Sequence, residues 1–382
     1  MKTENLFFIN NPKNEILHDQ TTALLKEGGA YEYHKSLPTY KPTSLYSLKS
    51  QAKKYHVSNI YVKDEATRFG LNAFKSLGAS FAINEVLKKK PDLQTFCTAT
   101  DGNHGRAVAW AASSAGKKSI VYVPKDTSKN RIEAISNEGA QVIQLDKNYD
   151  ETCAHAERKS VEEGWELVQD TAWEDYETVP ALIMAGYQTQ FKELEDSLHS
   201  MSLSKNDIVF LQAGVGSWAG SAIWYYLNRY GKSRPKIVIV EPFESAGVLA
   251  SFEAGYRVSP SGNYETIMGG LNCGIPSLTA WNIIKNGSDA ALRIEDSYAE
   301  TAMRMLYYPD QNDEQIIAGE SGVGGLAGFI AIMTDPRYDK LKKHLKITKD
   351  TNVILYNTEG ATDIDSFNRI VNLETDKKAN QL

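Results

Sequence analysis

Short apolar segments alternate with stretches of helical character along most of the chain, and this alternation constrains the fold more than any other feature. The apolar segments are 60–62, 95–97, 119–123, 141–143, 165–168, 208–211, 237–240 and 353–356. The segments that we expect to be helical are 75–89, 103–115, 128–137, 150–163 and a long amphipathic stretch after 178. Strands separated by helices form parallel sheets with the helices packed over their faces. The sequence therefore predicts an α/β protein.

The residues just after each strand are the first candidates for a functional site, since ligands of open parallel sheets bind at the carboxyl ends of the strands. Residues 212–220, QAGVGSWAG, follow one strand and open a helix. Bare amides at a helix N-terminus bind phosphate, and Ser217 can add a hydroxyl. Two other interpretations stay open: a tight turn without a ligand, and a nucleotide site in which Glu241, about 20 residues on, binds a ribose.

Three further strand ends carry polar residues: 98–106, 169–173 and 357–363. They contain the acids Asp101 and Asp170, the amide Asn103 and the hydroxyl of Thr358. These groups suit proton transfer and ligand binding. An acid at such a position can instead cap a helix, and for Asp170 this alternative stays open.

A single lysine, Lys75, lies among apolar and small residues in the stretch 68–79, RFGLNAFKSLGA, just ahead of a predicted helix. A partly desolvated amine loses its proton more easily and attacks carbonyl groups, which is how Schiff-base lysines arise. The alternative is an exposed lysine at a helix start, because lysine readily extends its amine to water.

Composition sets limits on the class of protein. The chain has 382 residues, of which 42% are hydrophobic and 24% charged, and its length favours two domains. The net charge is −6 and the longest basic run is 88–90, so we expect neither a nucleic-acid nor a membrane partner. We see no signal peptide and no apolar stretch of about 20 residues, which favours the cytoplasm.

Metal sites and disulfides are not indicated. Cys97, Cys153 and Cys273 lie far apart, and His104 and His155 lack the spacing of metal ligands. We expect structural or incidental roles for both histidines. The first fifty residues are polar and rich in turn formers, and Pro38 and Pro42 indicate an extended segment that wraps a surface or contacts a partner subunit.

Taken together, these motifs resemble the fold-type II pyridoxal-phosphate enzymes, the superfamily of tryptophan synthase beta and threonine dehydratase. Within it the chain is most similar to the diaminopropionate ammonia-lyases, from about Tyr40 to about Phe367. The matching blocks keep their order and are 72–78, 98–110, 168–173, 212–220, 268–274, 321–325 and 358–363.

The resemblance implies roles for individual residues. Lys75 would hold pyridoxal 5'-phosphate as a Schiff base, Asn103 would bond the cofactor's 3'-oxygen and Thr358 would face its pyridine nitrogen. Asp101 and Asp170 match the family's active-site acids. Because the α-hydrogens of the D and L isomers face opposite sides of a planar bound substrate, our own hypothesis is that Asp101 is the base for the D substrate and Lys75 the base for the L substrate. The cofactor's phosphate would be held by the amides of Gly214, Val215, Gly216 and Ser217.

The resemblance also implies an architecture and a reaction. We expect two parallel-sheet αβα domains with the cofactor between them, a large one from 1–91 and 191–382 and a small inserted one from 92–190, in a homodimer. The reaction would be α,β-elimination of 2,3-diaminopropionate, D and L, to pyruvate and two ammonia. The alternatives are a serine or threonine dehydratase, a cysteine desulfhydrase, or a nucleotide-binding protein using 214–220.

Two positions depart from the family's pattern. Some relatives carry a cysteine shortly after the Glu-Pro at 241–242 that can pair with the counterpart of Cys273, but this chain has Gly247 there, so we expect no disulfide. Trp218 is bulkier than the small residue expected in the glycine loop, which leaves the shape of the phosphate site open.

Overall fold

The computed structural model describes residues 5–100, 102–198 and 202–379, without the side chains of Asp150 and 373–379. The chain divides into two compact units. The first comprises Met1–Leu17, Pro42–Asn72 and Gln190–Leu382, and the second His18–Lys41 and Ala73–Thr189. Residues 73–91, which the sequence expectation assigns to the large domain, and the segment 18–41 fall in the second unit.

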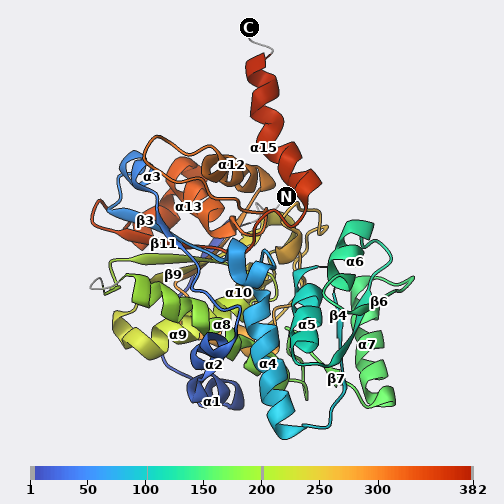
Figure 1. The fold of residues 1–382 in the computed structure, drawn as a ribbon. Coiled ribbons are helices and arrows are strands. Elements are labelled where there is room, and N and C mark those ends of the chain that lie inside the picture. Colours follow the sequence, from blue (N-terminus) through green and yellow to red (C-terminus); the bar gives the residue numbers. More distant parts are fainter. Residues whose placement is uncertain (1–4, 101, 199–201, 380–382) are drawn as a thin grey trace. The chain divides into compact units, whose positions relative to one another are not determined.

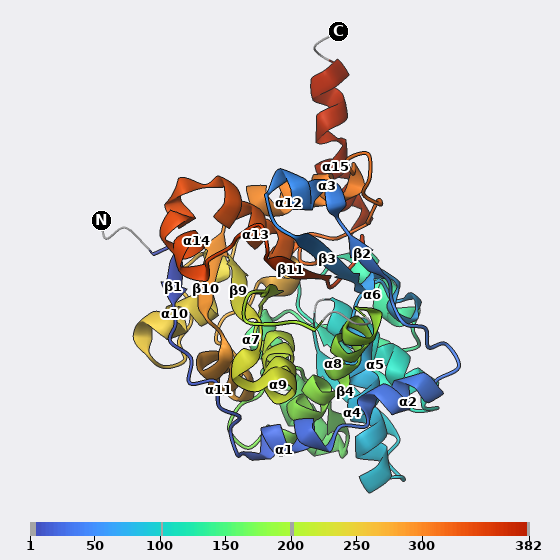
Figure 2. The ribbon, with the colours of Figure 1, turned by 90° about the vertical axis from the view of Figure 1, so that its left-hand side faces the viewer.

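The first unit is built on a seven-stranded sheet that runs from β1 at one edge to β2 at the other, and Figure 2 labels its strands in this order except for β8. The five inner strands run parallel, while the two edge strands, β1 and β2, are antiparallel to their neighbours. Across the sheet, the strands are β1 Phe7–Ile9, β10 Ala290–Ile294, β9 Lys236–Pro242, β8 Ile208–Gln212, β11 Asn352–Asn357, β3 Asn59–Asp64 and β2 Leu45–Ser47.

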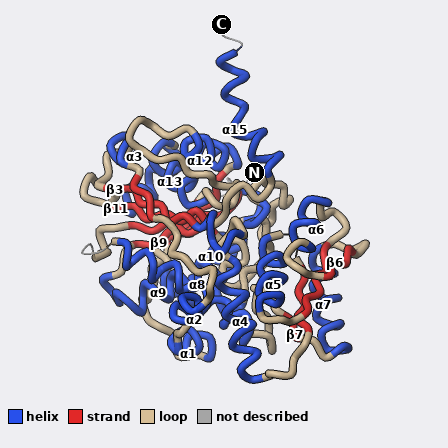
Figure 3. Tube along the Cα trace, viewed as in Figure 1, coloured by secondary structure: helices blue, strands red, loops and turns tan. Residues whose placement is uncertain are grey.

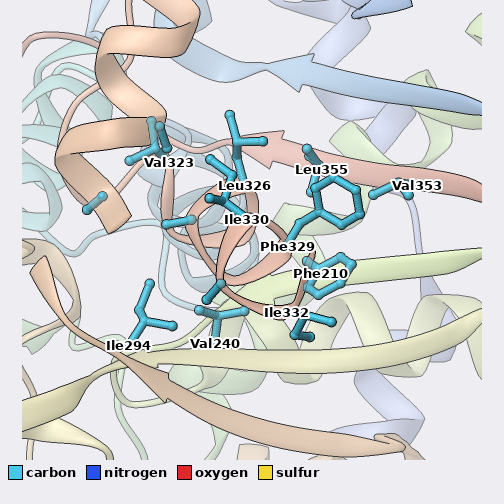
Figure 4. Packing of buried hydrophobic residues seen from close by; sticks show 14 of the residues in the cluster. Phe210, Val240, Ile294, Val323, Leu326, Phe329, Ile330, Ile332, Val353 and Leu355 are labelled. Carbon is cyan, nitrogen blue, oxygen red and sulfur yellow. The ribbon is translucent and has the colours of Figure 1, made fainter. Parts of the chain in front are cut away.

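Helices cover both faces of this sheet, with α12 and α13 on one face and α9 on the other (Figures 1 and 3). Helix α13 is apolar on nearly all sides and is buried, as such helices are. Its Phe329 and Ile330 pack with Phe210 and Leu355 of the sheet in the main core (Figure 4). The helices are α3 Lys49–Lys54, α9 Ser217–Tyr230, α10 Gly247–Ala254, α11 Leu278–Gly287, α12 Asp296–Tyr307, α13 Gly324–Thr334, α14 Asp339–Leu345 and α15 Ile364–Ala379. The short 3-10 helices are η1 Glu65–Gly70, η2 Gly231–Ser233, η3 Phe243–Ser245, η4 Gly269–Leu271 and η5 Pro336–Tyr338.

A cluster of four buried charged residues, which we call the ionic cluster, lies in the first unit beside β3. It consists of Lys63, Glu65, Arg68 and Glu193, each at most 2% exposed. Glu193 receives Lys63 Nζ at 2.7 Å and both terminal nitrogens of Arg68, while Arg68 also donates to Glu65. Although burial favours the neutral acid, Arg68 and Lys63 lower the pKa of Glu193 to about 2. The cluster therefore holds two cations and two anions in balance.

The second unit is built on a four-stranded parallel sheet in the order β6-β5-β4-β7 (Figure 1). Side chains of β5 alternate between two cores, as expected for a strand covered on both faces. Ile120 and Tyr122 pack with Ala156 of α7, whereas Val121 and Val123 pack with Ala109 of α5. The elements are α1 Gln20–Glu27, α2 Ala30–Ser36, α4 Lys75–Lys89, β4 Thr95–Ala99, α5 Asn103–Ser114, β5 Lys118–Val123, α6 Lys129–Ser136, β6 Gln141–Gln144, α7 Tyr149–Glu163 and β7 Glu166–Leu167. Helix α8 Thr178–Ser197 belongs to this unit as far as Thr189.

The predicted α/β class and the parallel sheets are confirmed. The sequence did not indicate the two helices α1 and α2, which lie in the segment expected to be turn-rich. Asp19 begins α1 with a reciprocal capping interaction with Thr22, and glycines at 28 and 29 with positive φ separate the helices. Within the described residues, no helix combines the length and apolarity needed to cross a bilayer.

Candidate active site

Lys75 is the first residue of α4, whose start is fixed by close packing onto α8 within the second unit. A Cβ added at Gly186 would lie 2.4 Å from the carbonyl oxygen of Leu77, and one added at Gly78 would lie 2.5 Å from Tyr187 Cε1. The two helices can approach this closely because glycine leaves no side chain between them. Lys75 thus projects from a helix end that has little freedom to shift.

The Lys75 amine contacts an acid. Lys75 Nζ donates to Asp170 Oδ2 at 2.5 Å, and the two side chains are 23% and 11% exposed. The amine is therefore not the freely solvated lysine of the alternative interpretation. Asp170 is not a helix cap, since no helix begins directly after it and the next helix, α8, begins at Thr178.

A buried histidine completes this group. His104 Nε2 lies 2.8 Å from the carbonyl oxygen of Val168, and Nδ1 lies 3.6 Å from Asp170 Oδ2. Burial lowers the pKa of His104 despite the nearby carboxylate, so Lys75 is the cation that faces Asp170 at neutral pH. Burial alone would raise the pKa of Asp170, but the charge and the hydrogen bond of Lys75 hold it well below its ordinary value. Asp170 is therefore a carboxylate throughout the physiological range.

Gln169 joins the strand end at β4 to the segment that carries Asp170. Its Oε1 accepts from Thr98 Oγ1 at 2.7 Å, and its Nε2 donates to the carbonyl oxygen of Ala99 at 2.9 Å. Asn103 begins α5, one residue before His104. The predicted acid Asp101 lies outside the described residues.

The glycine loop after β8 lies in the first unit and has the features of an anion site. Among the described residues, no acceptor takes the backbone N–H of Gly214, Val215 or Gly216. Gly216 precedes α9 with φ +88, and a Cβ there would meet Ile284 Cδ1 at 2.8 Å. At Gly214 a Cβ would meet Cys273 Sγ at 2.9 Å. Amides left with hydrogens to donate, at a helix N-terminus, favour a bound anion.

The two departures from the family's pattern have simple structural outcomes. The Trp218 ring is buried and packs against Phe191 and Tyr356, at ring-centroid distances of 6.0 and 5.3 Å, so its bulk goes into the core beside the loop. A Cβ at Gly247 would lie 2.2 Å from the carbonyl oxygen of Gly274. A side chain has no room there, and Cys273 forms no disulfide.

Thr358 follows β11, also in the first unit, and is 4% exposed. Its Oγ1 lies 3.0 Å from Nε2 of Gln212, the last residue of β8. The hydroxyl is therefore held beside the strand that leads into the glycine loop.

Glu241 does not have the geometry of a ribose-binding acid. It is fully buried, and its two carboxylate oxygens accept from the backbone amides of Val248 and Leu249 at 2.7 and 2.9 Å. Both oxygens are thus committed to the N-terminus of α10, which removes the main support for the nucleotide interpretation.

Three neighbours of the predicted residues were not identified as functional from the sequence: His104, Gln169 and Gln212. Their partners lie 64 to 146 positions away, as with His104 and Val168 or Gln212 and Thr358, so no local spacing points to them. The available signal was that each stands inside a matching block: His104 in 98–110, Gln169 in 168–173 and Gln212 in 212–220. Within the described residues no cluster of side chains suits a metal ion.

Comparison with known proteins gives a consistent result. The family model described as pyridoxal-phosphate dependent enzyme matches residues 37–358. Diaminopropionate ammonia-lyase of Escherichia coli K12 is 38% identical over 96% of this chain and 95% of its own length. Its crystal structure in complex with an aminoacrylate-PLP azomethine reaction intermediate covers 97% of each chain with a TM-score of 0.87. A catabolic L-threonine dehydratase of Staphylococcus aureus is 24% identical over 90% of this chain and 94% of its own.

Proposed function

Since the chain belongs to the diaminopropionate ammonia-lyase family of pyridoxal-phosphate dependent enzymes, we propose that it eliminates ammonia from 2,3-diaminopropionate. The D and L isomers would both be substrates, and the products would be pyruvate and two ammonia. The observation that carries the choice of substrate is the ionised Asp170 beside Lys75.

The residues present fit pyridoxal 5'-phosphate. Lys75 supplies an amine that can bind the cofactor's aldehyde carbon. The amides of Gly214, Val215 and Gly216, which donate to no described residue, suit its phosphate, together with Ser217. Thr358 supplies a hydroxyl for the pyridine nitrogen and Asn103 an amide for the 3'-oxygen. Each of these groups has the chemistry that its part of the cofactor requires.

When bound, the cofactor withdraws electrons from the substrate's α-carbon and so weakens the bond to the α-hydrogen. The protein must still take the α-proton and protonate the leaving amine, because an unprotonated amine leaves poorly. We assign proton removal to Lys75 for the L isomer and to Asp101 for the D isomer. Asp170 orients the β-ammonium group of the substrate or assists its departure.

Asp170 distinguishes this substrate from serine and threonine. Once Lys75 holds the cofactor, the carboxylate loses the cation that it faces at 2.5 Å. A β-ammonium group restores a charge-assisted hydrogen bond, whereas a β-hydroxyl restores a weaker neutral one. The site therefore favours diaminopropionate over the substrates of the dehydratases.

The decisive measurement is kcat/KM for diaminopropionate, serine and threonine, taken with the same enzyme. A hydrogen bond to a charged group contributes about 1.5–3 kcal/mol and a neutral one about 0.5–1.5 kcal/mol, so the difference of about 1–1.5 kcal/mol predicts a preference of roughly 5-fold to 13-fold for diaminopropionate. Asp170→Asn, which keeps the shape of the side chain, should narrow that preference. Equal or faster turnover of serine or threonine by the unmodified enzyme would favour the dehydratase alternative.

We also propose a cytoplasmic location and, from the family alone, a homodimer. The division into a large domain of 1–91 and 191–382 and a small one of 92–190 is likewise proposed. A molar mass of one chain by light scattering of the loaded protein would contradict the homodimer.

A further inference from the structure

The side chain of Gln212 connects strands β8 and β11 where their backbones no longer pair. The two strands are in register only at Ile208 with Val353 and Val209 with Ile354, although β8 continues to Gln212 and β11 to Asn357. Gln212 Nε2 lies 2.9 Å from the carbonyl oxygen of Tyr356, beyond the end of this pairing. A side-chain amide here replaces the missing backbone donor.

The same nitrogen also lies 2.9 Å from the carbonyl oxygen of Gly322, in the glycine-rich turn before α13. This turn is shaped around the glutamine. A Cβ added at Gly324 would lie 2.8 Å from Gln212 Cβ, and one at Gly325 would lie 3.1 Å from Gln212 Oε1. Gln212 is itself 3% exposed. The glycines of the block 321–325, which the sequence left without a role, make room for this side chain.

These contacts fix which end of the amide faces Thr358. Backbone carbonyl oxygens only accept hydrogen bonds, so the group that lies between those of Tyr356 and Gly322 must be the NH2 group and not the oxygen. An amide nitrogen accepts no hydrogen bond. Thr358 Oγ1, at 3.0 Å from the same nitrogen, is therefore an acceptor towards Gln212.

The consequence concerns the hydroxyl proton of Thr358. Among the described residues no acceptor takes it. A buried hydroxyl whose proton has no acceptor is unfavourable, typically by about 1–3 kcal/mol. Thr358 is therefore prepared to donate to a bound group.

We propose that Gln212 is a positioning residue that directs the Thr358 hydroxyl to donate to the pyridine nitrogen of the cofactor and so keeps that nitrogen unprotonated. This inference rests on the proposed function, in which Thr358 faces the ring. A nitrogen that accepts a hydrogen bond cannot carry a proton on the same lone pair. With an unprotonated nitrogen, the bound ring would withdraw electrons from the substrate less strongly, which suits elimination.

The test measures the protonation state of the pyridine nitrogen in the intact holoenzyme. Protein is loaded with ¹⁵N-labelled pyridoxal 5'-phosphate, and the ¹⁵N chemical shift of the ring is recorded from about pH 6 to about pH 9, the range around neutrality where function is measured. We expect the shift of an unprotonated pyridine, without titration. A shift of a protonated pyridine at neutral pH would overturn the inference, even in an enzyme that eliminates ammonia from diaminopropionate.

Substitutions separate positioning from a general structural role. In Gln212→Leu the Thr358 hydroxyl loses its donor and can turn to the freed carbonyl oxygens, so the ¹⁵N shift should move towards the protonated value. In Thr358→Val the hydroxyl is absent, and adding Gln212→Leu should change the shift no further. If Gln212→Leu changed the ¹⁵N shift equally in the unmodified chain and in Thr358→Val, the proposal would be contradicted. Thr358→Ser, which retains the hydroxyl, should behave like the unmodified chain.

A loading control keeps this test independent of the proposed function. Borohydride bleaching of the visible absorption band reports whether the cofactor is bound through a lysine, whatever the state of its ring nitrogen. A protein that never develops such a band would refute the proposed function itself. If Gln212→Leu does not fold, Gln212→Met, which keeps an unbranched side chain of similar length without the NH2 group, provides the same comparison, and a protonated pyridine in the unmodified holoenzyme would overturn the inference without any variant.

Discussion

Lys75 and Asp170 form a charged pair at 2.5 Å in the second unit, and the pair identifies the lysine that should react. We expect Lys75→Ala protein to bind pyridoxal 5'-phosphate without the covalent link, and to lose turnover, because no other amine is held at the same helix start. The measurement is mass spectrometry of peptides after borohydride reduction of the unmodified enzyme. Recovery of the cofactor on a different lysine would show the assignment to be wrong.

Asp101 gives a stereochemical prediction. The α-hydrogens of the D and L isomers face opposite sides of a planar bound substrate, so one fixed base serves one isomer. Loss of a catalytic base typically lowers the rate by about 100-fold to 10,000-fold, so Asp101→Asn should reduce D turnover by that order and largely spare L turnover. The check is kcat for each isomer. Parallel loss of both would mean that Asp101 supports the site and does not select a face.

The proposed site residues could be identified from the sequence because each stands in a short motif, either after a strand or, for Lys75, ahead of a helix. Lys75, Asp170 and the glycine loop are of this kind. The residues that orient them could not, because their function depends on contacts across the fold. Gln212 donates a hydrogen bond to Thr358, which lies 146 positions away in the sequence. The direction of this bond follows from the carbonyl oxygens of Tyr356 and Gly322, which the sequence does not place beside Gln212.

The turn between β8 and α9 gives a prediction at the level of an element. Gly216 has φ +88, and a Cβ there would meet Ile284 at 2.8 Å. Alanine in this left-handed conformation costs about 1–2 kcal/mol, and relief of the contact would move the amides that we assign to the phosphate. Gly216→Ala should therefore raise the dissociation constant of the cofactor, measured by titration of the cofactor-free protein.

Gly255 offers a matched control in the same unit. It has φ +83, and no heavy atom lies within 4 Å of an added Cβ. Gly255→Ala imposes the same backbone strain without crowding the loop, so it should lower stability while leaving the cofactor affinity unchanged. Weaker cofactor binding in both variants would show that strain alone accounts for the effect.

Most strands were predictable because each is a short apolar run, whereas β1, β2 and β10 were not identified from the sequence. Helix α1 is different: it has eight residues, of which only Thr21, Thr22 and Leu25 are buried, and two of these are polar. A short helix with one buried leucine leaves almost no periodic signal. Its start at Asp19 depends on a capping interaction that could have been read from the Asp and Thr three positions apart.

For the molecule as a whole, Glu241 predicts how stability depends on pH. Burial raises its pKa to about 8, against the opposing effect of the amides of Val248 and Leu249 and of Arg293. The folded chain therefore keeps a proton that the unfolded chain releases at the ordinary pKa of 4.5. Its contribution to stability is complete below that value and is lost as the pH rises through about 8.

The thermal midpoint of the cofactor-free protein should accordingly fall by a few degrees between about pH 6 and about pH 9. Glu241→Gln removes the titrating group, so its midpoint should be lower overall, because one backbone amide loses its acceptor, and should change less with pH. An unchanged slope in this variant would assign the pH dependence to other groups.

The two compact units differ from the domains that we propose at residues 18–41 and 73–91. Residues 18–41 are separated from the rest of the second unit by 31 residues that belong to the first, Pro42–Asn72. Which core a short surface helix joins is decided by its tertiary contacts and not by its own pattern. The sequence therefore predicted two domains but assigned this segment to the large one.

The ionic cluster of the first unit limits which amino-acid substitutions this chain can accept during evolution. Replacing one member of a buried ion pair leaves its partner charged and desolvated, at a cost of about 3–5 kcal/mol. That is a large part of the stability of a typical domain, about 5–15 kcal/mol. An apolar set of similar volume can be equally stable, yet every single-step path to it from Lys63, Glu65, Arg68 and Glu193 passes through an uncompensated charge. These four positions are therefore expected to be inherited together, and to differ between descendants of one ancestor only as a group.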